Sequence, residues 1–264
     1  MIDLATRCLD VNCANFALGC ESFRTAHGVF VRNREFPIIY DANHVSHVTA
    51  VEPGEIDELM AAAEREFEGY NHRRFEVDFR TPPSFVARLA LEGYERDDAL
   101  LLVLEGELNS EAPEHDVRPV QTESDWRDYF YLKELDWLDF TERTARPPEP
   151  QVGQQLMYVR RRKCPPAQYW IAYVDGRPAA FLNSWAGVNG VGQVEDLFTH
   201  KEYRRRGLAT ALIHRCVADC RAKGAGPVII AANPNDTPKN MYAAMGFGPV
   251  VVCSHYLKKL APAP

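Results

Sequence analysis

A short basic loop between an apolar segment and an amphipathic one constrains this chain more than any other feature. The loop Arg204-Arg205-Arg206-Gly207 follows the apolar segment 194–199. After it, apolar side chains recur at helical spacing: Leu208, Leu212, Ile213, Cys216, Val217 and Cys220. A strand is therefore expected to lead into the first turn of a helix, where N–H groups lack internal partners and carry partial positive charge. Such a place suits a phosphate, and Gly207 lets an anion approach the backbone. The alternative is a solvated basic turn before a helix.

A second segment, about 30 residues further on, follows the apolar run 228–232 and reads NDTPKNMYAAMGF from Asn235 to Phe247. Together the two segments resemble the GNAT acyl-CoA N-acyltransferase superfamily. The loop matches the family pattern R/Q-x-x-G-x-G/A at Arg204, Gly207 and Ala209. The second segment matches N-x-x-A-x-x-L-Y-x-x-x-G-F at Asn235, Met241, Tyr242, Gly246 and Phe247. Pro238 stands where the family usually has alanine, a change that a first helical turn tolerates.

The resemblance implies an α/β (α+β) fold, in which helices flank a mixed, mostly antiparallel central sheet. We expect residues 117–260 to form a complete catalytic GNAT domain. Its predicted elements are a strand at 117–120, helices at 124–137 and 154–162, a hairpin of 169–174 and 178–185, a strand ending at Thr199, a helix from 208, a strand at 228–232, a helix containing Tyr242 and a strand through 257. Thr122 and Ser124 are the candidate caps of the first of these helices.

The first part of the chain repeats this pattern weakly. Gly54 and Gly207, Gly93 and Gly246, and Phe75 and Val228 are each 153 residues apart. Each pair occupies a comparable place among apolar strands and amphipathic helices, which indicates a duplication. We therefore expect residues 1–110 to form a truncated, degenerate GNAT-like lobe without the opening strand and helices, packed on the catalytic lobe beside its substrate cleft.

The predicted first lobe lacks the features of the anion site. The offset places Val51-Glu52-Pro53 where the second lobe has its three arginines, and it places Leu89 where the second lobe has Tyr242. Carboxylates at the start of a helix compete for its N–H groups and repel a pyrophosphate. The sequence therefore predicts no acyl-CoA site in residues 1–110.

The resemblance implies which residues hold acetyl-CoA, the expected co-substrate. Backbone groups around Arg206, Gly207, Leu208 and Ala209 would hold the pyrophosphate, with Arg204 and Arg205 in the same basic loop. Phe198 and Thr199 would pair with the pantetheine arm, and an amide near Phe198 would polarise the thioester carbonyl. Asn235 would contact the pantetheine or cap the following helix.

Tyr242 and Glu195 are the candidate catalytic residues. A phenol, with a pKa of about 10, is protonated at neutral pH and can donate a proton to the leaving thiolate. The alternative is that Tyr242 only packs on the pantetheine. Glu195 and Asp196 are adjacent on one strand, so their side chains are expected to point to opposite faces, with one at the cleft. We favour Glu195 as the base that deprotonates the amine, against a structural role for either acid or a reaction without a dedicated base.

Charge and composition narrow the function further. Residues 1–110 carry a formal charge of −10 and residues 111–264 carry +3, which makes nucleic-acid binding by the first part unlikely on electrostatic grounds. No apolar run approaches the roughly 20 residues of a membrane span, and no signal pattern opens the chain, so a cytoplasmic protein without a membrane partner is expected. The spacing of Cys8, Cys13, Cys20 and His27 fits no common zinc site, and no metal is expected.

Three functions follow as hypotheses. The first is an acetyl-CoA-dependent N-acetyltransferase acting on a primary amine of a small molecule. The second is a GNAT-fold transferase whose donor or acceptor is an aminoacyl-tRNA or a carrier-protein-bound acyl group. In it the basic run 160–163 would be the docking patch, unless that run only complements the dipole at a helix end. The third is a non-catalytic acyl-CoA sensor. The sequence leaves the amine, the acyl chain and the oligomeric state open.

Overall fold

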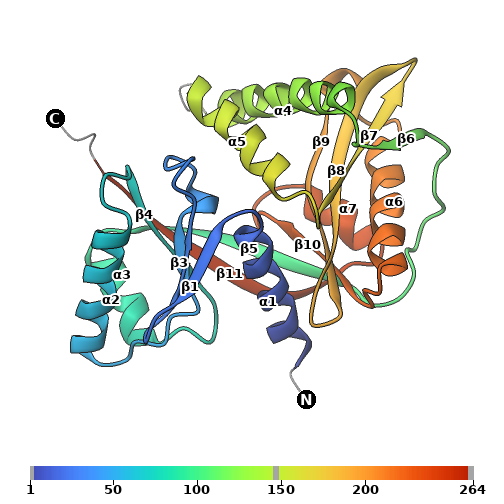
Figure 1. The fold of residues 1–264 in the computed structure, drawn as a ribbon. Helices are drawn as coiled ribbons and strands as arrows, with labels where there is room; N and C mark the ends of the chain where they lie inside the picture. The colour runs from blue at the N-terminus through green and yellow to red at the C-terminus, as the bar shows by residue number, and fades with distance from the viewer. Residues whose placement is uncertain (1–2, 145–148, 261–264) are drawn as a thin grey trace.

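A computed structural model describes residues 3–144 and 149–260 of the chain (Figure 1). Within these ranges the strands form one sheet of eleven, in the order β1-β2-β3-β4-β11-β5-β10-β9-β8-β7-β6, with helices on both faces. Two neighbouring pairs, β3–β4 and β9–β10, are parallel, and the others are antiparallel. The predicted fold class, a mostly antiparallel sheet flanked by helices, is confirmed.

The first half of the chain begins with helix α1 and ends with the long strand β5, and its elements follow in chain order. They are α1 (Leu4–Ala17), β1 (Glu21–Arg24), β2 (Val29–Arg32), the 3-10 turn η1 (Tyr40–Ala42), β3 (His44–Ser46), α2 (Pro53–Glu66), β4 (His72–Val77), α3 (Pro83–Leu91) and β5 (Glu95–Leu104).

The second half begins with strand β6 and ends with the long strand β11, and its elements follow in chain order. They are β6 (Asp116–Pro119), α4 (Glu123–Thr144), α5 (Pro150–Arg162), β7 (Gln168–Val174), β8 (Arg177–Val188), β9 (Val191–Thr199), the 3-10 turn η2 (Lys201–Tyr203), α6 (Leu208–Ala222), β10 (Val228–Ala232), α7 (Pro238–Ala244) and β11 (Gly248–Lys259).

The two halves exchange their last strands. β11 lies between β4 and β5, and β5 lies between β11 and β10. Figure 1 shows β5 and β11 side by side through the middle of the molecule, where they pair from Gly248↔Val103 to Leu257↔Glu95. One continuous sheet therefore includes strands of both halves. The division into domains 1–110 and 117–260 remains a prediction.

The predicted repeat is visible in the order of elements. The series β3-α2-β4-α3-β5 in the first half recurs as β9-α6-β10-α7-β11 in the second. The sequence analysis expected the first lobe to lack opening helices, and this is wrong, because α1 precedes β1. At the start of α2, the Glu55 carboxylate accepts from the N–H groups of Val51 (2.9 Å) and Glu52 (3.1 Å). Acidic side chains thus occupy the place of the basic loop.

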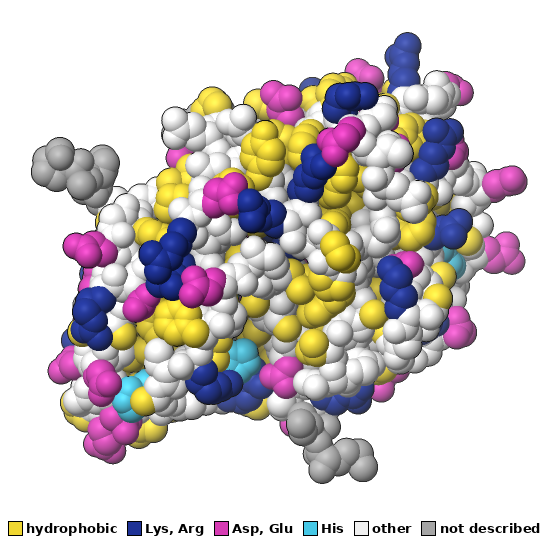
Figure 2. All heavy atoms as spheres, viewed as in Figure 1, with side chains coloured by type: hydrophobic (Ala, Val, Ile, Leu, Met, Phe, Trp, Pro, Cys, Tyr) yellow, Lys and Arg dark blue, Asp and Glu magenta, His cyan; other side chains and the backbone are white. Residues whose placement is uncertain are grey.

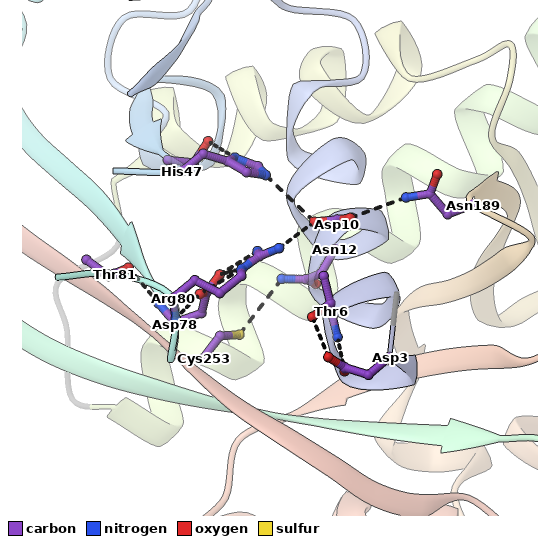
Figure 3. Close-up of polar contacts among 11 residues, drawn as sticks. Asp3, Thr6, Asp10, Asn12, His47, Asp78, Arg80, Thr81, Asn189 and Cys253 are labelled. Atoms are coloured by element: carbon purple, nitrogen blue, oxygen red, sulfur yellow. Dashed lines mark hydrogen bonds and ion pairs between the residues drawn. The ribbon is translucent and has the colours of Figure 1, made fainter. Parts of the chain in front are cut away.

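Helix α1 is a polar link between the two halves (Figure 3). Asp10 on this helix accepts from Arg80 after β4 (2.7 Å) and from Asn189 in the β8–β9 turn (3.3 Å). His47, after β3, lies 3.9 Å from the same carboxylate. Three other residues of α1, Cys8, Leu9 and Val11, are buried. They belong to one hydrophobic cluster together with residues of β5, β9 and β10. The helix thus packs on both halves of the sheet.

Several predicted boundaries shift when the tertiary contacts are present. Helix α4 continues to Thr144, beyond the predicted end at 137, and Thr122 is its cap, accepting from the Asp125 N–H (3.2 Å). Helix α5 begins at Pro150, before the predicted start at 154, and residues 145–148 lie outside the described residues. No helix in the described ranges combines the length and apolar character of a membrane span.

Candidate active site

A cleft of about 660 Å³ lies where β9 ends and α6 begins. Three segments that are distant in the sequence line it: α4, the stretch from β9 to the first turn of α6, and the loop and helix around α7. Among the predicted site residues, its lining includes Phe198, Thr199, Arg204, Arg205, Gly207, Leu208, Ala209 and Tyr242. The two sequence segments of the family resemblance therefore meet at one surface.

The first turn of α6 presents backbone donors to this cleft. Gly207 precedes the helix with a φ of 83°, a conformation that glycine adopts without the cost borne by other residues. The first intrahelical bond in this turn runs from the Ala211 N–H to the Gly207 carbonyl (3.0 Å). The N–H groups of Leu208, Ala209 and Thr210 come before it, so the helix offers them no acceptor. This is the geometry that binds an anion at a helix start.

The three arginines of the loop have different surroundings. Arg204 lines the cleft and donates to the Thr199 carbonyl (3.1 Å) and to Asp139 on α4 (3.1 Å). Arg205 also lines the cleft and has a φ of 64°, left-handed for a non-glycine residue. Arg206 lies outside the lining, with its guanidinium over the Tyr203 ring at 5.4 Å. Two of the three arginines thus line the cleft, and of these Arg204 is paired with Asp139.

A β-bulge shapes β9 next to the cleft. Asn183 pairs with Glu195 and Phe181 with Phe198, so β9 contains one residue more than β8 between these pairs. Asp196 takes up the extra length with a φ of 68°. A bulge bends its strand and re-aims side chains, and the expected alternation of Glu195 and Asp196 is broken here. Both carboxylates instead lie near cations at the C-terminal end of α5.

Asp196 is held in a buried ion network. Its carboxylate accepts from Lys133 Nζ (2.7 Å) and the Tyr129 hydroxyl (3.1 Å), and it lies 3.3 Å from Arg160 Nε. Burial alone would raise the pKa of Asp196, but Lys133 and Arg160 outweigh it and hold the pKa well below its usual value. Such a carboxylate is a weak base, so Glu195 is the better candidate of the two.

Glu195 lies outside the cleft lining, on the side of the sheet that α1 and α5 cover. Its Oε2 atom is 3.8 Å from Lys163 Nζ, and it is buried without a hydrogen-bond partner among the described residues. Lys163 donates to Asn15 of α1 (2.5 Å). Burial lowers the pKa of Lys163, and Glu195 opposes that shift. The structure thus places a carboxylate with an open acceptor site next to the bulge, and its role as base stays a prediction.

Tyr242 enters the cleft from α7. Its side chain is mostly buried, and the ring lies 6.4 Å from the Phe247 ring, centroid to centroid. Burial, together with the charge of Asp236, raises the pKa of Tyr242 to about 12. The phenol therefore keeps its proton at neutral pH, as a general acid requires.

Some predicted residues lie away from the cleft, and others line it without having been predicted. Asn235 is exposed in the loop before α7 and is absent from the lining, and its proposed contact with the coenzyme stays a prediction. The sequence analysis missed the wall that α4 contributes, namely Asp136, Asp139 and Arg143. Their spacing of three and four residues puts them on one helical face, a signal present in the sequence.

The basic run at the end of α5 is paired within the chain. Arg160 lies near Asp196 and Asp41, Arg161 pairs with Glu123, Arg162 with Glu35 and Lys163 with Glu195. On the face drawn in Figure 2, Lys and Arg side chains are dispersed among acidic ones instead of forming one basic patch. Both observations favour the structural interpretation of this run over a docking patch.

Comparison with known proteins agrees with this geometry. Residues 129–247 match the model of the Acetyltransferase (GNAT) family, while no curated protein matches the sequence significantly. A functionally unknown conserved protein from Staphylococcus epidermidis has a similar structure, with a TM-score of 0.70 and 14% identity over 92% of this chain and 96% of that chain. A GCN5-related N-acetyltransferase from Kribbella flavida has a TM-score of 0.67 and 17% identity over 98% of this chain and 96% of that chain.

A third similar structure is a tandem GNAT protein from the clavulanic acid biosynthesis pathway, with a TM-score of 0.59 and 14% identity over 91% of this chain and 82% of that chain. At these identities the likeness concerns the fold alone. The family match covers the elements from α4 to α7 that build the cleft, so residues 129–247 are similar to the GNAT acetyltransferase family over this part of the chain.

Proposed function

We propose that this protein is an acyl-CoA-dependent N-acyltransferase that transfers an acetyl group from acetyl-CoA to a primary amine of a small molecule. The observation that carries the proposal is the convergence of three features on one cleft: the first turn of α6, the end of β9, and Tyr242. The donors of residues 208–210 and the charges of Arg204 and Arg205 fit a pyrophosphate.

The residues of the cleft support direct transfer. A neutral amine attacks the thioester carbonyl, the C–N bond forms, and the C–S bond breaks. Tyr242 donates its phenolic proton to the departing sulfur, and the proton lost by the amine passes to a base, for which Glu195 is the candidate. Backbone amides of β9 near Phe198 would stabilise the oxyanion that develops on the carbonyl oxygen.

The alternative donors receive less support. A carrier-protein or tRNA donor needs an accessible basic surface, and the run 160–163 is committed to acids of the same chain. A sensor would not need a protonated phenol in its ligand cleft. A cytoplasmic location stays a prediction.

The test follows free thiol after the protein is mixed with acetyl-CoA and a panel of primary amines, alongside calorimetry with CoA. We expect CoA to bind and thiol to appear only with an accepted amine. Arg205→Glu should weaken CoA binding by about tenfold or more, because it puts a carboxylate at the anion site. Arg177→Glu, the same change at the exposed first residue of β8, is the matched control. Absence of both CoA binding and thiol release would refute the proposal.

A further inference from the structure

The buried ion network around β9 is part of a longer row of charged side chains. The row leads from the first half of the molecule to the cleft at the start of α6, and each member lies within 3.6 Å of the next. Carboxylates and cations alternate along it in the order Glu76, Arg74, Asp41, Arg160, Asp196, Lys133 and Asp136. The row thus begins and ends with a carboxylate, and its described members carry one negative charge in excess.

Asp136 is the end of the row that a ligand can reach. It lines the cleft with 27% of its side chain exposed, whereas the Glu76 side chain at the other end is 9% exposed. Among the described residues, Lys133 is the one cation that pairs with Asp136, and Lys133 is shared with Asp196. Because a row of buried charges is costly unless its charges are compensated, a further cation at Asp136 would stabilise it.

The arginines that line the cleft do not supply this cation. Arg143 lies 3.2 Å from Asp139, and Arg204 lies 3.1 Å from the same carboxylate. Arg205 belongs to the basic loop, which the proposed function assigns to the pyrophosphate. The position beside Asp136 is therefore open to a cation that comes with a ligand.

The place of Asp136 along the cleft suits the acceptor. The contact of Asp139 with Arg204 puts one turn of α4 beside the basic loop. Asp136 lies one turn earlier, about 4.5 Å along the helix axis, and Lys133 joins it to the bulge of β9. A pantetheine arm that follows β9 away from the basic loop therefore leads toward Asp136. Tyr242 lines the same cleft, so an amine held by Asp136 shares one space with the candidate acid.

We propose that Asp136 binds the ammonium group of the acceptor, and that the acceptor is an alkylamine, which is charged at neutral pH, and not an arylamine, which is neutral. This inference rests on the proposed acetyltransferase function. A carboxylate accepts charge-assisted hydrogen bonds from an ammonium group, and these are stronger than the hydrogen bonds of a neutral amine. One ammonium group also continues the alternation of charge along the row. Loss of the ammonium proton stays with the base of the proposed reaction.

Calorimetry on the CoA-saturated protein tests the assignment without turnover. The probe is n-butylammonium chloride, n-butanol is its neutral counterpart, and sodium chloride corrects for ionic strength. We expect the ammonium probe to bind at least about tenfold more tightly than n-butanol, because it makes a charge-assisted hydrogen bond.

Three variants locate the binding group. Asp136→Asn should weaken binding of n-butylammonium by about tenfold or more and leave the Kd of CoA within about twofold of the parent value. Asp136→Glu keeps the charge and should retain most of the affinity. Glu134→Gln removes the same charge at an exposed position of α4 outside the cleft lining, and as the matched control it should leave binding unchanged.

The thiol-release assay adds a second readout. We expect n-butylamine to be a better acceptor than aniline, with a KM that rises by about tenfold in Asp136→Asn and stays unchanged in Glu134→Gln. The assignment is overturned if CoA binds and the ammonium probe does not, if n-butanol binds as tightly as the probe, if Asp136→Asn binds the probe as the parent does, or if aniline is the better acceptor. Failure of CoA to bind at all overturns the proposed function itself, which separates the two failures.

Discussion

Tyr242 shows how one side chain acquires its properties from its position. The phenol lies on α7, a short helix that begins at Pro238, and it enters the cleft across from the first turn of α6. Burial raises its pKa to about 12, so the group stays neutral across the physiological range. A neutral phenol beside a departing thiolate can donate its proton. The same burial keeps the phenol of Tyr242 protonated when no thiolate is present.

Replacing Tyr242 by phenylalanine tests this role at the residue scale. The variant keeps the ring that packs near Phe247 and loses only the hydroxyl. We expect kcat to fall by about 100-fold, because general acid catalysis contributes on this order, while the Kd of CoA stays within about twofold. In the parent protein, ionisation of Tyr242 should not reduce kcat between about pH 7 and 10, since its pKa is near 12. A variant with unchanged kcat would assign Tyr242 to packing alone.

At the scale of elements, β9 is fixed to α4 and α5 by buried charges. Lys133 of α4 and Arg160 of α5 both approach Asp196 at the bulge. These side chains are buried, with Lys133 and Arg160 each 7% exposed, so each charge depends on its partners. This network holds α4 and α5 against the strand that bears the candidate base.

Asp196→Asn tests the network. The change removes a carboxylate shared by two buried cations, while Lys133 keeps Asp136 and Arg160 keeps Asp41. It should therefore destabilise the fold by about 3 kcal/mol, the low end for a broken buried ion pair, in urea unfolding at pH 7. Because the folded-state pKa of Asp196 lies below the 3.8 of a free aspartate, its contribution is complete above about pH 4 and is lost as the pH falls below that value. The variant should therefore show a shallower loss of stability in acid. Asp175→Asn, in the exposed β7–β8 turn, is the control, and equal stabilities of the two variants would contradict the argument.

At the scale of the whole molecule, the exchanged strands make the halves depend on one another. Without residues 117–264, β5 loses both neighbours, β10 and β11, and exposes apolar side chains such as Leu101 and Leu102. Without residues 1–110, β11 loses both β4 and β5. Each half alone would present an unpaired strand in place of the centre of the sheet.

We expect the full chain to unfold in one cooperative transition, with equal calorimetric and van't Hoff enthalpies. Residues 1–110 and 117–264, expressed separately, should lack dispersed amide NMR spectra, and co-expression of the two fragments should restore them. An isolated 117–264 fragment that is folded and binds CoA with the affinity of the full chain would show instead that the halves are independent.

The sequence by itself determined the parts of this protein that depend on near neighbours along the chain. The loop from Arg204 to Gly207, the amphipathic helix after it and the Asp175-Gly176 hairpin follow from periodicity, turn chemistry and helix-end electrostatics, and they appear as predicted. The cleft combines the two segments that the family resemblance singled out. These features are predictable because each depends on the backbone preference of a residue and on the few residues that follow it in the sequence.

Only the tertiary structure decided the rest. The exchange of β5 and β11, the bulge that turns Asp196 toward α4 and α5, and the wall that α4 adds to the cleft depend on contacts between residues far apart in the sequence. An apolar strand carries no mark of which strand it will pair with. A carboxylate likewise gives no sign of which buried cation will neutralise it. Hydrophobic burial and ion pairing act between whichever groups the fold brings together, and that choice is made over the whole molecule.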